Sequence, residues 1–589
     1  MELTDPSPVG ALAGPGREIV RAWRPRAPQQ TLLLLAVFLA SLLVFLAGPD
    51  AGSGDTEPAE LLPISILVDH RLDFDRFYGA RQDLPYPYRR VGGHVVSAYP
   101  IMAGLANLPV YAAARLAGAD LRASRSRLSH VTAALLAAGS VLFFFLASQS
   151  VCHSLRGAMF SAAVYAFGTE VWSVASRGAW QHAPSLFFLC ASLWLLLSGA
   201  REEFKSSEGA PAPLRVPPRL AVSGATLGLA VASRPTDIVI ALAAASFVLV
   251  RRPSRFPLFF LFAAIPAAAL MLYSALWLGN PLALGQLYRS LGFGGRPFFG
   301  LAGLLVSPSR GLFVFSPILL GCVPGAWIAW KSRHRGHEPL PWLAAGVVAT
   351  LALFSFWGMW WGGASFGYRI LLDVIPVLAI LSAIGWEIGP PLPPGQWRCR
   401  RLVFAALFLL SIYVEVLGVF AYPTHFDEGL DLEVDRLWDV RESELVFASR
   451  KLFRLQSAPA KSEVAPVWWS PEKNDDAIPG WIEASPGGTT VRGDLFVSGW
   501  AKSATGNVEV AIAFDGGAVV RPERFARPDV ASVLPELGDT ATAGFRATVA
   551  APPGPLRERA MTVEWKDLRG RVRRLGPVHF RWKGVSDRH

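Results

Sequence analysis

Apolar runs that approach or reach membrane-spanning length recur along the first 421 residues of this chain. A helix needs about 20 residues to cross the ~30 Å hydrocarbon layer of a bilayer. Charged residues make up only 17% of the chain, whereas about a quarter is usual in soluble domains. The sequence therefore predicts a polytopic α-helical membrane protein with eleven crossings, at 31–49, 128–148, 156–174, 183–200, 219–234, 237–250, 257–279, 312–330, 340–360, 370–388 and 402–421.

The net charge of +11 does not indicate nucleic acid as a partner. Lysine and arginine lie mainly in short segments between the apolar runs, where they determine membrane topology. Four arginines precede the first run within residues 1–30, so this run is typical of an uncleaved signal anchor. The four cysteines are scattered through or beside apolar runs and predict no disulfide framework or metal-ligand spacing.

Residues 97–118 form a further apolar run, and its placement decides the predicted orientation. If it crosses the membrane, three later basic groups lie on the side opposite the basic N-terminus. If it lies in the interface, they share the side of the N-terminus, which the positive-inside rule favours. We therefore predict a cytoplasmic tail at 1–30, a first external loop at 50–127 with juxtamembrane helices, and an external C-terminal region.

The composition changes after residue 421, and the chain becomes more polar. A charged segment opens a predicted surface linker at 422–479. Short alternating runs such as 495–497 and 508–513 follow, separated by Gly, Asn and Asp turns, which is the pattern of antiparallel strands. Residues 480–589 are expected to form an extracytoplasmic β-sandwich accessory domain. It contains no recognisable pair of nucleophile and base.

The first external loop concentrates acidic residues in a chain that is otherwise 52% hydrophobic. Its LDFD stretch places Asp73 and Asp75 two residues apart, with Asp69 shortly before. On an extended segment both carboxylates point the same way, and either suits a general base or an orienting group. The alternative is a pair of solvated loop carboxylates.

Several other ionisable residues are expected on the same external side. Such residues at membrane depth are costly and usually face a cavity or a partner, and arginine is suited to bidentate contacts with phosphate. They are Arg127, Arg177, His182, Arg234, Asp237 and Arg369.

Each of these residues also has a structural interpretation. Arg234 would pair with Asp237, His182 would cap a helix, and Arg369 would anchor the interface. The nearby tryptophans, including Trp361, fit an interfacial aromatic belt, with sugar stacking as the alternative.

The order and spacing of these segments over roughly 30–421 resemble the GT-C superfamily of polyprenyl-phosphate-sugar-dependent glycosyltransferases. This class includes protein O-mannosyltransferases and lipid A aminoarabinose transferases, and the chain is most similar to a bacterial branch. The segments that carry the resemblance are the LDFD loop, GGHVVSAYPIMAGLANLPVYAAARLAG, SRGAWQHAPSL, GATLGLAVASRPTDIVIALAAASFVLV and WWGGASFGYRILLDVIPVLAI.

The resemblance implies a GT-C-like fold in which an acidic residue of the first external loop is the catalytic base. That role falls on Asp73 or Asp75, with Asp69 in reserve. Phe74 separates the two carboxylates, whereas many relatives have them adjacent, and Ala98-Tyr99-Pro100 stands where relatives often carry Pro-Pro. The implied donor-phosphate ligands are Arg127, Arg234 and Arg369. The implied substrate contacts are Asp69, His94, Tyr99, Arg177, His182, Asp237 and Trp361.

The activity implied is inverting transfer of a hexose or pentose from a polyprenyl-phosphate donor to a hydroxyl of a glycan, lipid or protein acceptor. It would take place on the extracytoplasmic side of a bacterial plasma (inner) membrane. The sequence requires no cofactor, and a divalent cation on the loop carboxylates is compatible with it. The competing classes are a transporter or lipid flippase, although we see no internal repeat, and a non-catalytic scaffold for the β domain.

Overall fold

The computed structural model describes residues 27–79, 84–207, 216–283, 295–331, 337–387, 394–422, 434–453, 480–484, 490–492, 495–502, 508–515, 517–525, 543–550, 557–567, 570 and 572–583. The chain divides into two compact units, Met1–Leu452 and Phe453–His589. The first is built almost entirely of helices and the second of strands.

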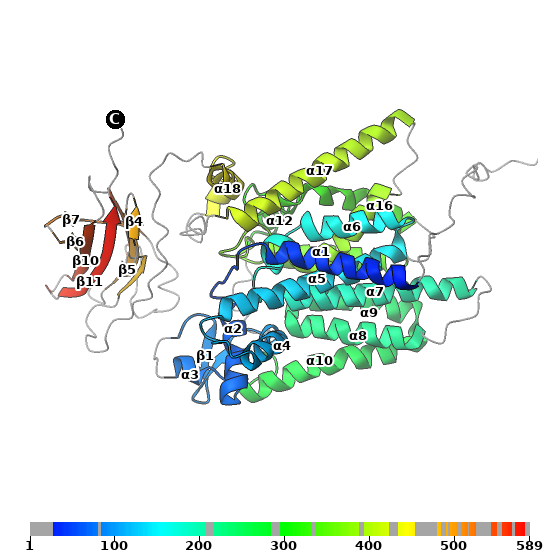
Figure 1. The fold of residues 1–589 in the computed structure, drawn as a ribbon, viewed down its shortest axis with the longest axis horizontal. Coiled ribbons are helices and arrows are strands. Elements are labelled where there is room, and N and C mark those ends of the chain that lie inside the picture. The colour runs from blue at the N-terminus through cyan, green and yellow to red at the C-terminus, as the bar shows by residue number, and fades with distance from the viewer. Residues whose placement is uncertain are drawn as a thin grey trace, which may run out of the picture. The chain divides into compact units, whose positions relative to one another are not determined.

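Long helices lie side by side in the first unit (Figure 1). Each of the eleven predicted crossings overlaps at least one of them. They are α1 (Ala27–Leu46), α5 (Arg125–Val151), α6 (Leu155–Phe167), α7 (His182–Ser207), α8 (Val216–Ser233), α9 (Ile238–Arg251), α10 (Phe256–Trp277), α14 (Cys322–Lys331), α15 (Leu340–Ser355), α16 (Ile375–Glu387) and α17 (Pro394–Phe420).

Six helical segments among the described residues are long and apolar enough to span a membrane, and four shorter apolar helices accompany them. Other predicted crossings are interrupted. The crossing at 312–330 consists of α13 (Leu312–Phe315), the 3₁₀ helix η6 (Pro317–Gly321) and α14. The first break falls at Pro317, since proline lacks the N–H that would continue a helix. The number of eleven crossings stays a prediction.

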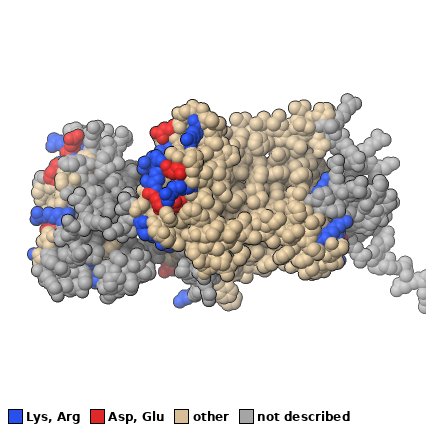
Figure 2. Space-filling model, turned by 90° about the horizontal axis from the view of Figure 1, so that it is seen from below, with Lys and Arg blue, Asp and Glu red and all other residues tan. Residues whose placement is uncertain are grey.

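Charge is segregated along the first unit. On the face shown in Figure 2, a wide band without Lys, Arg, Asp or Glu lies between two charged ends. One end carries both signs, and the described surface at the other carries basic side chains. This distribution fits a bundle whose middle lies in hydrocarbon. The orientation of the bundle stays a prediction.

The predicted first external loop, residues 50–127, folds into a packed subdomain. Its helices and strands are α2 (Glu57–Ile64), the π-helix η2 (Ser65–Asp69), α3 (Asp75–Tyr78), β1 (Tyr88–Val91), β2 (His94–Ser97) and α4 (Met102–Leu116). The hairpin β1–β2 turns through Gly92 and Gly93, both with positive φ, which a two-residue hairpin turn favours. Phe74, Tyr88 and Val95 are buried together in its core.

The run predicted to lie in the interface is α4. Its buried residues, Ala103, Gly104, Asn107 and Tyr111, recur at helical spacing, whereas Leu116 is 90% exposed. The helix contacts α2 and α5. It is therefore one-sided, as an interfacial helix must be, and its membrane placement stays a prediction.

Short elements complete the first unit. They are the π-helix η3 (Val171–Ala175), the 3₁₀ helices η4 (Pro235–Asp237), η5 (Pro253–Arg255), η7 (Arg369–Val374) and η9 (Val434–Trp438), and the helices α12 (Pro297–Val306) and α18 (Glu444–Leu452). The last two in sequence, η9 and α18, fall in the predicted surface linker. Both pack against the bundle, where Leu437 and Ala448 are fully buried in its core. The extent of the surface linker stays a prediction.

The second unit contains two sheets. Their strands are β3 (Gly480–Ala484), β4 (Thr490–Arg492), β5 (Leu495–Ala501), β6 (Glu509–Phe514), β7 (Val519–Val520), β8 (Glu523–Phe525), β9 (Gly544–Val549), β10 (Arg557–Lys566) and β11 (Val572–Lys583). The sheet orders are β4-β11-β10-β6-β7 and β3-β5-β9-β8. Val497 and Phe545 of one sheet share a buried cluster with Ile512 and Trp565 of the other. The predicted C-terminal strands are therefore confirmed, and the sandwich architecture and its extracytoplasmic location stay predictions.

Candidate active site

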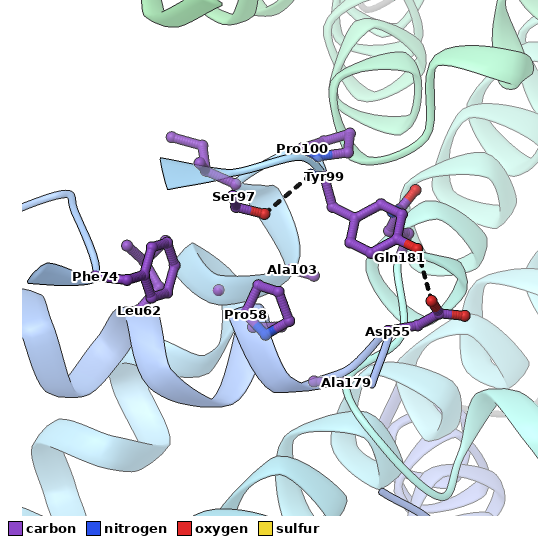
Figure 3. Close-up of a pocket in the computed structure, with 13 residues that line it drawn as sticks. Asp55, Pro58, Leu62, Phe74, Ser97, Tyr99, Pro100, Ala103, Ala179 and Gln181 are labelled. Atoms are coloured by element: carbon purple, nitrogen blue, oxygen red, sulfur yellow. Dashed lines mark hydrogen bonds between the residues drawn. The ribbon is translucent and has the colours of Figure 1, made fainter. Parts of the chain in front are cut away.

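A small pocket lies where the first external loop meets the helical bundle. Figure 3 shows Asp55, Tyr99 and Gln181 on one side of it, and Leu62 and Phe74 on the other. The remaining lining residues are Pro58, Ala59, Ser97, Pro100, Ile101, Ala103, Gly104 and Ala179. The pocket thus joins a polar group of side chains to an apolar wall.

Asp55 lies in a turn between α1 and α2, where its N–H donates to Ser53 Oγ at 3.1 Å. Its Oδ1 accepts hydrogen bonds of 2.6 Å from the hydroxyls of Tyr86 and Tyr99, the second of which is drawn in Figure 3. Its Oδ2 accepts one of 2.8 Å from Arg369 Nη1. Burial raises the pKa of Asp55, but Arg369 and the two tyrosines outweigh it, so the pKa lies below 3.8. Asp55 is therefore ionised at neutral pH.

Arg369 begins η7, and its guanidinium is held from several sides. Nη2 donates to the Gly362 carbonyl at 2.6 Å, and the guanidinium carbon lies 4.3 Å from the centre of the Trp180 ring. The side chain is 11% exposed. A planar guanidinium fixed over an aromatic face is pre-organised to donate two hydrogen bonds to the oxygens of a carboxylate or a phosphate.

Asp73 and Asp75 lie together beside His94, although the LDFD segment is not extended, because the chain bends at Asp73 and α3 begins at Asp75. Arg71 Nε donates to Asp73 at 2.7 Å, and Arg71 Nη2 lies 3.0 Å from Asp75. Asp75 also accepts from the Val95 N–H and contacts His94 Nδ1, both at 2.7 Å. The Asp73 side chain is 2% exposed and that of Asp75 is 26% exposed. Asp75 is therefore the more accessible of the two.

These hydrogen bonds affect the protonation of Asp75. Burial raises its pKa, but the Val95 N–H, His94 and Arg71 together outweigh burial and lower it. The carboxylate is consequently ionised while it ties α3 to β2.

One group of side chains among the described residues has the composition and spacing to hold a metal ion, namely Asp73, Asp75 and His94, whose ligand atoms lie within 4.8 Å of one another. Arg71 already forms ion pairs with both carboxylates. A cation would have to displace this guanidinium, so these residues fit a divalent ion only with Arg71 moved away.

Arg234, a predicted phosphate ligand, lies in a buried network instead of at the pocket. It forms an ion pair with Asp373, a 2.7 Å hydrogen bond with His182 Nδ1, and a 3.1 Å hydrogen bond to the Ile370 carbonyl. Its side chain is 7% exposed. Arg234 thereby fixes η7, the element that begins with Arg369.

Asp237 belongs to the same network. Its Oδ2 accepts a 2.6 Å hydrogen bond from Ser185, and its Oδ1 has no hydrogen-bond partner among the described residues. The pairing of Arg234 with Asp237 that we considered from sequence is replaced by the ion pair with Asp373. Asp373 was not recognised in the sequence, because a single acid in an apolar run does not reveal its partner.

The other predicted residues lie apart from the pocket lining. Arg177 is buried and donates to the carbonyls of Pro49 and Gly418. Arg127 is exposed at the start of α5. Asp69 forms an ion pair of 2.5 Å with Arg76. Trp361 is buried beside Trp360, with ring centres 6.0 Å apart.

Asp55 is the pocket acid that sequence reasoning missed. It lies in the stretch GSGDTEPAE, directly after the first apolar run. A Ser or Asp in such a stretch usually indicates the start of a helix. In the sequence Asp55 therefore resembled an ordinary turn residue. Only its contact with the distant Arg369 in the folded chain distinguishes it from one.

No family model and no curated protein matches this sequence. Solved structures similar to it include ArnT from Cupriavidus metallidurans bound to undecaprenyl phosphate, with 16% identity, a TM-score of 0.46, and 73% of this chain and 76% of ArnT covered. Another is the Archaeoglobus fulgidus oligosaccharyltransferase tethered to an acceptor peptide, with 14% identity and a TM-score of 0.44.

The oligosaccharyltransferase match covers 71% of this chain and 61% of that protein. The AglB structure from the same organism, in complex with an inhibitory peptide and a dolichol-phosphate, has 14% identity, a TM-score of 0.42, and coverage of 70% and 61%. At these identities and scores the similarity describes the fold and carries no assignment of function.

Proposed function

We propose that this chain is a membrane glycosyltransferase that transfers a sugar from a polyprenyl-phosphate donor to an acceptor hydroxyl. The observation that carries the proposal is the contact of Asp55 with Arg369 at the edge of the pocket. The reaction needs a base for the hydroxyl and a cation for the phosphate that leaves. We propose Asp55, which lines a partly apolar pocket, and the guanidinium of Arg369, which contacts Asp55, for these two roles.

Arg369 is the proposed phosphate ligand. When the donor binds, its phosphate takes the place of the Asp55 carboxylate against the guanidinium. Asp55 then loses the favourable charge of Arg369, while burial, which raises its pKa, remains. The exchange makes Asp55 a stronger base only after the donor is in place.

Asp55 is the proposed base. It already accepts two hydrogen bonds from phenol hydroxyls, so it is placed to accept one from a substrate hydroxyl. The acceptor oxygen attacks the anomeric carbon on the face opposite the phosphate, and its proton passes to Asp55. The bond from the anomeric carbon to the phosphate oxygen breaks, and the polyprenyl phosphate leaves with the electron pair beside Arg369. The product has inverted anomeric configuration.

Asp75 and then Asp73 are the alternative bases, in the order of their exposure. Arg127, exposed at the start of α5, is a second proposed contact for the donor phosphate. We place Arg234 behind Arg369 as a support. We further propose that the reaction occurs at the extracytoplasmic face of a plasma membrane. The acceptor hydroxyl belongs to a glycan, a lipid or a protein. If the acceptor is a glycan, the second unit assists in binding it.

The buried network around Arg234 favours a second candidate, a lipid flippase, because ionisable groups at membrane depth often mark a substrate pathway. Among the described residues, the side chains of this network form an ion pair and hydrogen bonds with one another. Asp55, in contrast, lines a pocket, and Arg369 contacts Asp55 from outside the pocket lining. We therefore rank transfer above transport.

The test is transfer of radiolabelled sugar from polyprenyl-phosphate sugars in membranes that contain wild type, D55N, D73N or D75N at matched expression. We expect D55N to reduce transfer at least about 100-fold, since removal of a general base costs this order of rate. The control is D120N, because Asp120 only accepts from the N–H groups of Arg122 and Ala123. Full activity of D55N with loss in D75N would move the base to Asp75. Wild-type flipping of a labelled lipid, without transfer from any donor, would favour the flippase.

A further inference from the structure

The segment between α15 and η7 positions Arg369. Few hydrogen bonds within the backbone of this segment fix its conformation. Gly362, Gly363 and Gly367 all have positive φ, between 58° and 79°, so the segment is a series of turns. Gly362 N–H donates to the Met359 carbonyl at 2.9 Å. Further along, the backbone donors are satisfied by side chains from elsewhere in the chain. We call residues 362–368 the glycine loop.

Two buried carboxylates accept the last backbone donors of the glycine loop. Glu170 Oε1 accepts from the Tyr368 N–H at 2.6 Å. Glu444 Oε2 accepts from the Gly367 N–H at 3.0 Å. Gly367 and Tyr368 are the two residues directly before Arg369. The direction in which the Arg369 side chain leaves the backbone is thus set by two distant acids.

Glu444 comes from α18, after the last long helix of the bundle, and its residue is fully buried. Arg310 Nη1 donates to the same Oε2 at 2.7 Å, and Arg310 is 1% exposed. The Glu444 N–H also lies 3.3 Å from Ser309 Oγ. A buried carboxylate is tolerated because the guanidinium compensates its charge. Arg310 therefore holds Glu444 at the position where it meets Gly367.

Further contacts next to Arg310 and Glu444 attach the segment with η9 and α18 to the bundle. Ser307 Oγ donates to the Leu437 carbonyl at 2.8 Å, and α18 contacts α17, beside which it lies in Figure 1. The chain after the last long helix thus returns to the end of the bundle and inserts one charged side chain.

We infer that Glu444 is a positioning residue for Arg369, and that Arg310 acts through Glu444. The pair holds the glycine loop so that the guanidinium faces Asp55 and Trp180. The consequence for donor binding rests on the proposed function, in which Arg369 binds the donor phosphate. The alternative is that the pair only fastens α18 to the bundle.

The test measures hydrogen exchange by mass spectrometry on the full-length protein in detergent, with binding of polyprenyl phosphate as a second readout. The main variant is R310M/E444M, because replacing a buried ion pair by apolar side chains of similar size usually preserves the fold. It removes the acceptor for the Gly367 N–H. We expect exchange in a peptide spanning 362–369 to rise about 10-fold and polyprenyl phosphate to bind about 10-fold more weakly, since the freed loop lets Arg369 sample other directions.

Two further variants make the result specific. E444Q keeps an oxygen that accepts from Gly367, so it should show a smaller rise in exchange than R310M/E444M. E387Q is the matched control, since Glu387 accepts from Ser154 Oγ and the His153 N–H at 2.7 and 3.1 Å and joins other segments. It should leave exchange at 362–369 and polyprenyl phosphate binding unchanged.

Wild-type exchange at 362–369 in a folded R310M/E444M protein would overturn the inference. If that variant does not fold, R310A/E444A, which removes the same acceptor with smaller side chains, decides in its place, because raised exchange at 444–452 with no change at 362–369 would assign Glu444 to α18 alone. If wild type itself does not bind polyprenyl phosphate, the proposed function fails, while exchange at 362–369 still decides the role of Glu444.

Discussion

Arg369 donates a 2.8 Å hydrogen bond to Asp55 across 314 positions of sequence. Arg369 begins η7, and Asp55 precedes α2. Their contact joins the predicted first external loop to a late segment of the bundle. It also places a cation beside a carboxylate that lines the pocket, and both side chains are largely withdrawn from water.

The chemistry of the Arg369 side chain should matter beyond its charge. R369K keeps a positive charge but loses the planar group that lies over Trp180. We expect the donor KM to rise about 10-fold in R369K and about 100-fold in R369Q, with the acceptor KM nearly unchanged. Initial rates over a range of donor concentrations check this. W180F keeps an aromatic face and should raise the donor KM only a few-fold. Equal donor KM values in wild type and R369Q would exclude Arg369 as the phosphate ligand.

The pH dependence of transfer should differ between free and donor-bound enzyme. In the free protein the contacts of Asp55 with Arg369 and the two tyrosines lower its pKa from the ordinary aspartate value, and the ionised form is the active one. Activity governed by this group therefore falls only at a pH more acidic than that at which an ordinary aspartate becomes protonated. With donor bound, Arg369 is engaged by phosphate and the pKa of Asp55 rises, so the acid limb of kcat should lie at higher pH than that of kcat/KM. Coincident acid limbs would contradict the exchange of partners.

Breaking the buried ion pair of Arg234 with Asp373 should destabilise the bundle. R234M or D373N leaves one charge buried without its partner, which costs about 3–5 kcal/mol. Unfolding in detergent, followed by thermal or denaturant titration, measures the loss. The double variant R234M/D373L should be more stable than either single variant, since neither charge remains. If all three were equally destabilised, the ion pair would not be the cause.

Two glycines of the glycine loop offer a matched comparison. G363A and G367A both place a side chain at positive φ, which costs about 1–2 kcal/mol. A Cβ at Gly363 would have Arg369 Nη2 as its nearest contact, at 4.0 Å, whereas one at Gly367 would lie 1.9 Å from Glu170 Oε1. We expect G367A to lose roughly 1–3 kcal/mol more than G363A because of this overlap. Thermal unfolding of the two proteins compares them, and equal losses would show that the backbone angle alone matters.

The helical architecture followed from local features of the sequence. Hydrocarbon length and apolar runs set the helices, so all eleven predicted crossings meet a helix. The break in the crossing at 312–330 falls at Pro317, as the missing N–H of proline explains. In the second unit, the alternating runs at 495–497 and 508–513 predicted strands, because period two places one face in a core, and the structure has strands there.

The pairing of charged residues depended on the tertiary structure. The acidic loop, Arg234 and Arg369 were all visible as polar residues in an apolar chain. Sequence spacing could not show that Arg234 pairs with Asp373, that Arg369 pairs with Asp55, or that Glu444 reaches the glycine loop. Burial makes an unpaired charge costly wherever it lies, but only the folded chain decides which distant partner compensates it. The sequence thus determined that charges would gather at the end of a membrane bundle, and the packing of the helices decided which of them face the pocket.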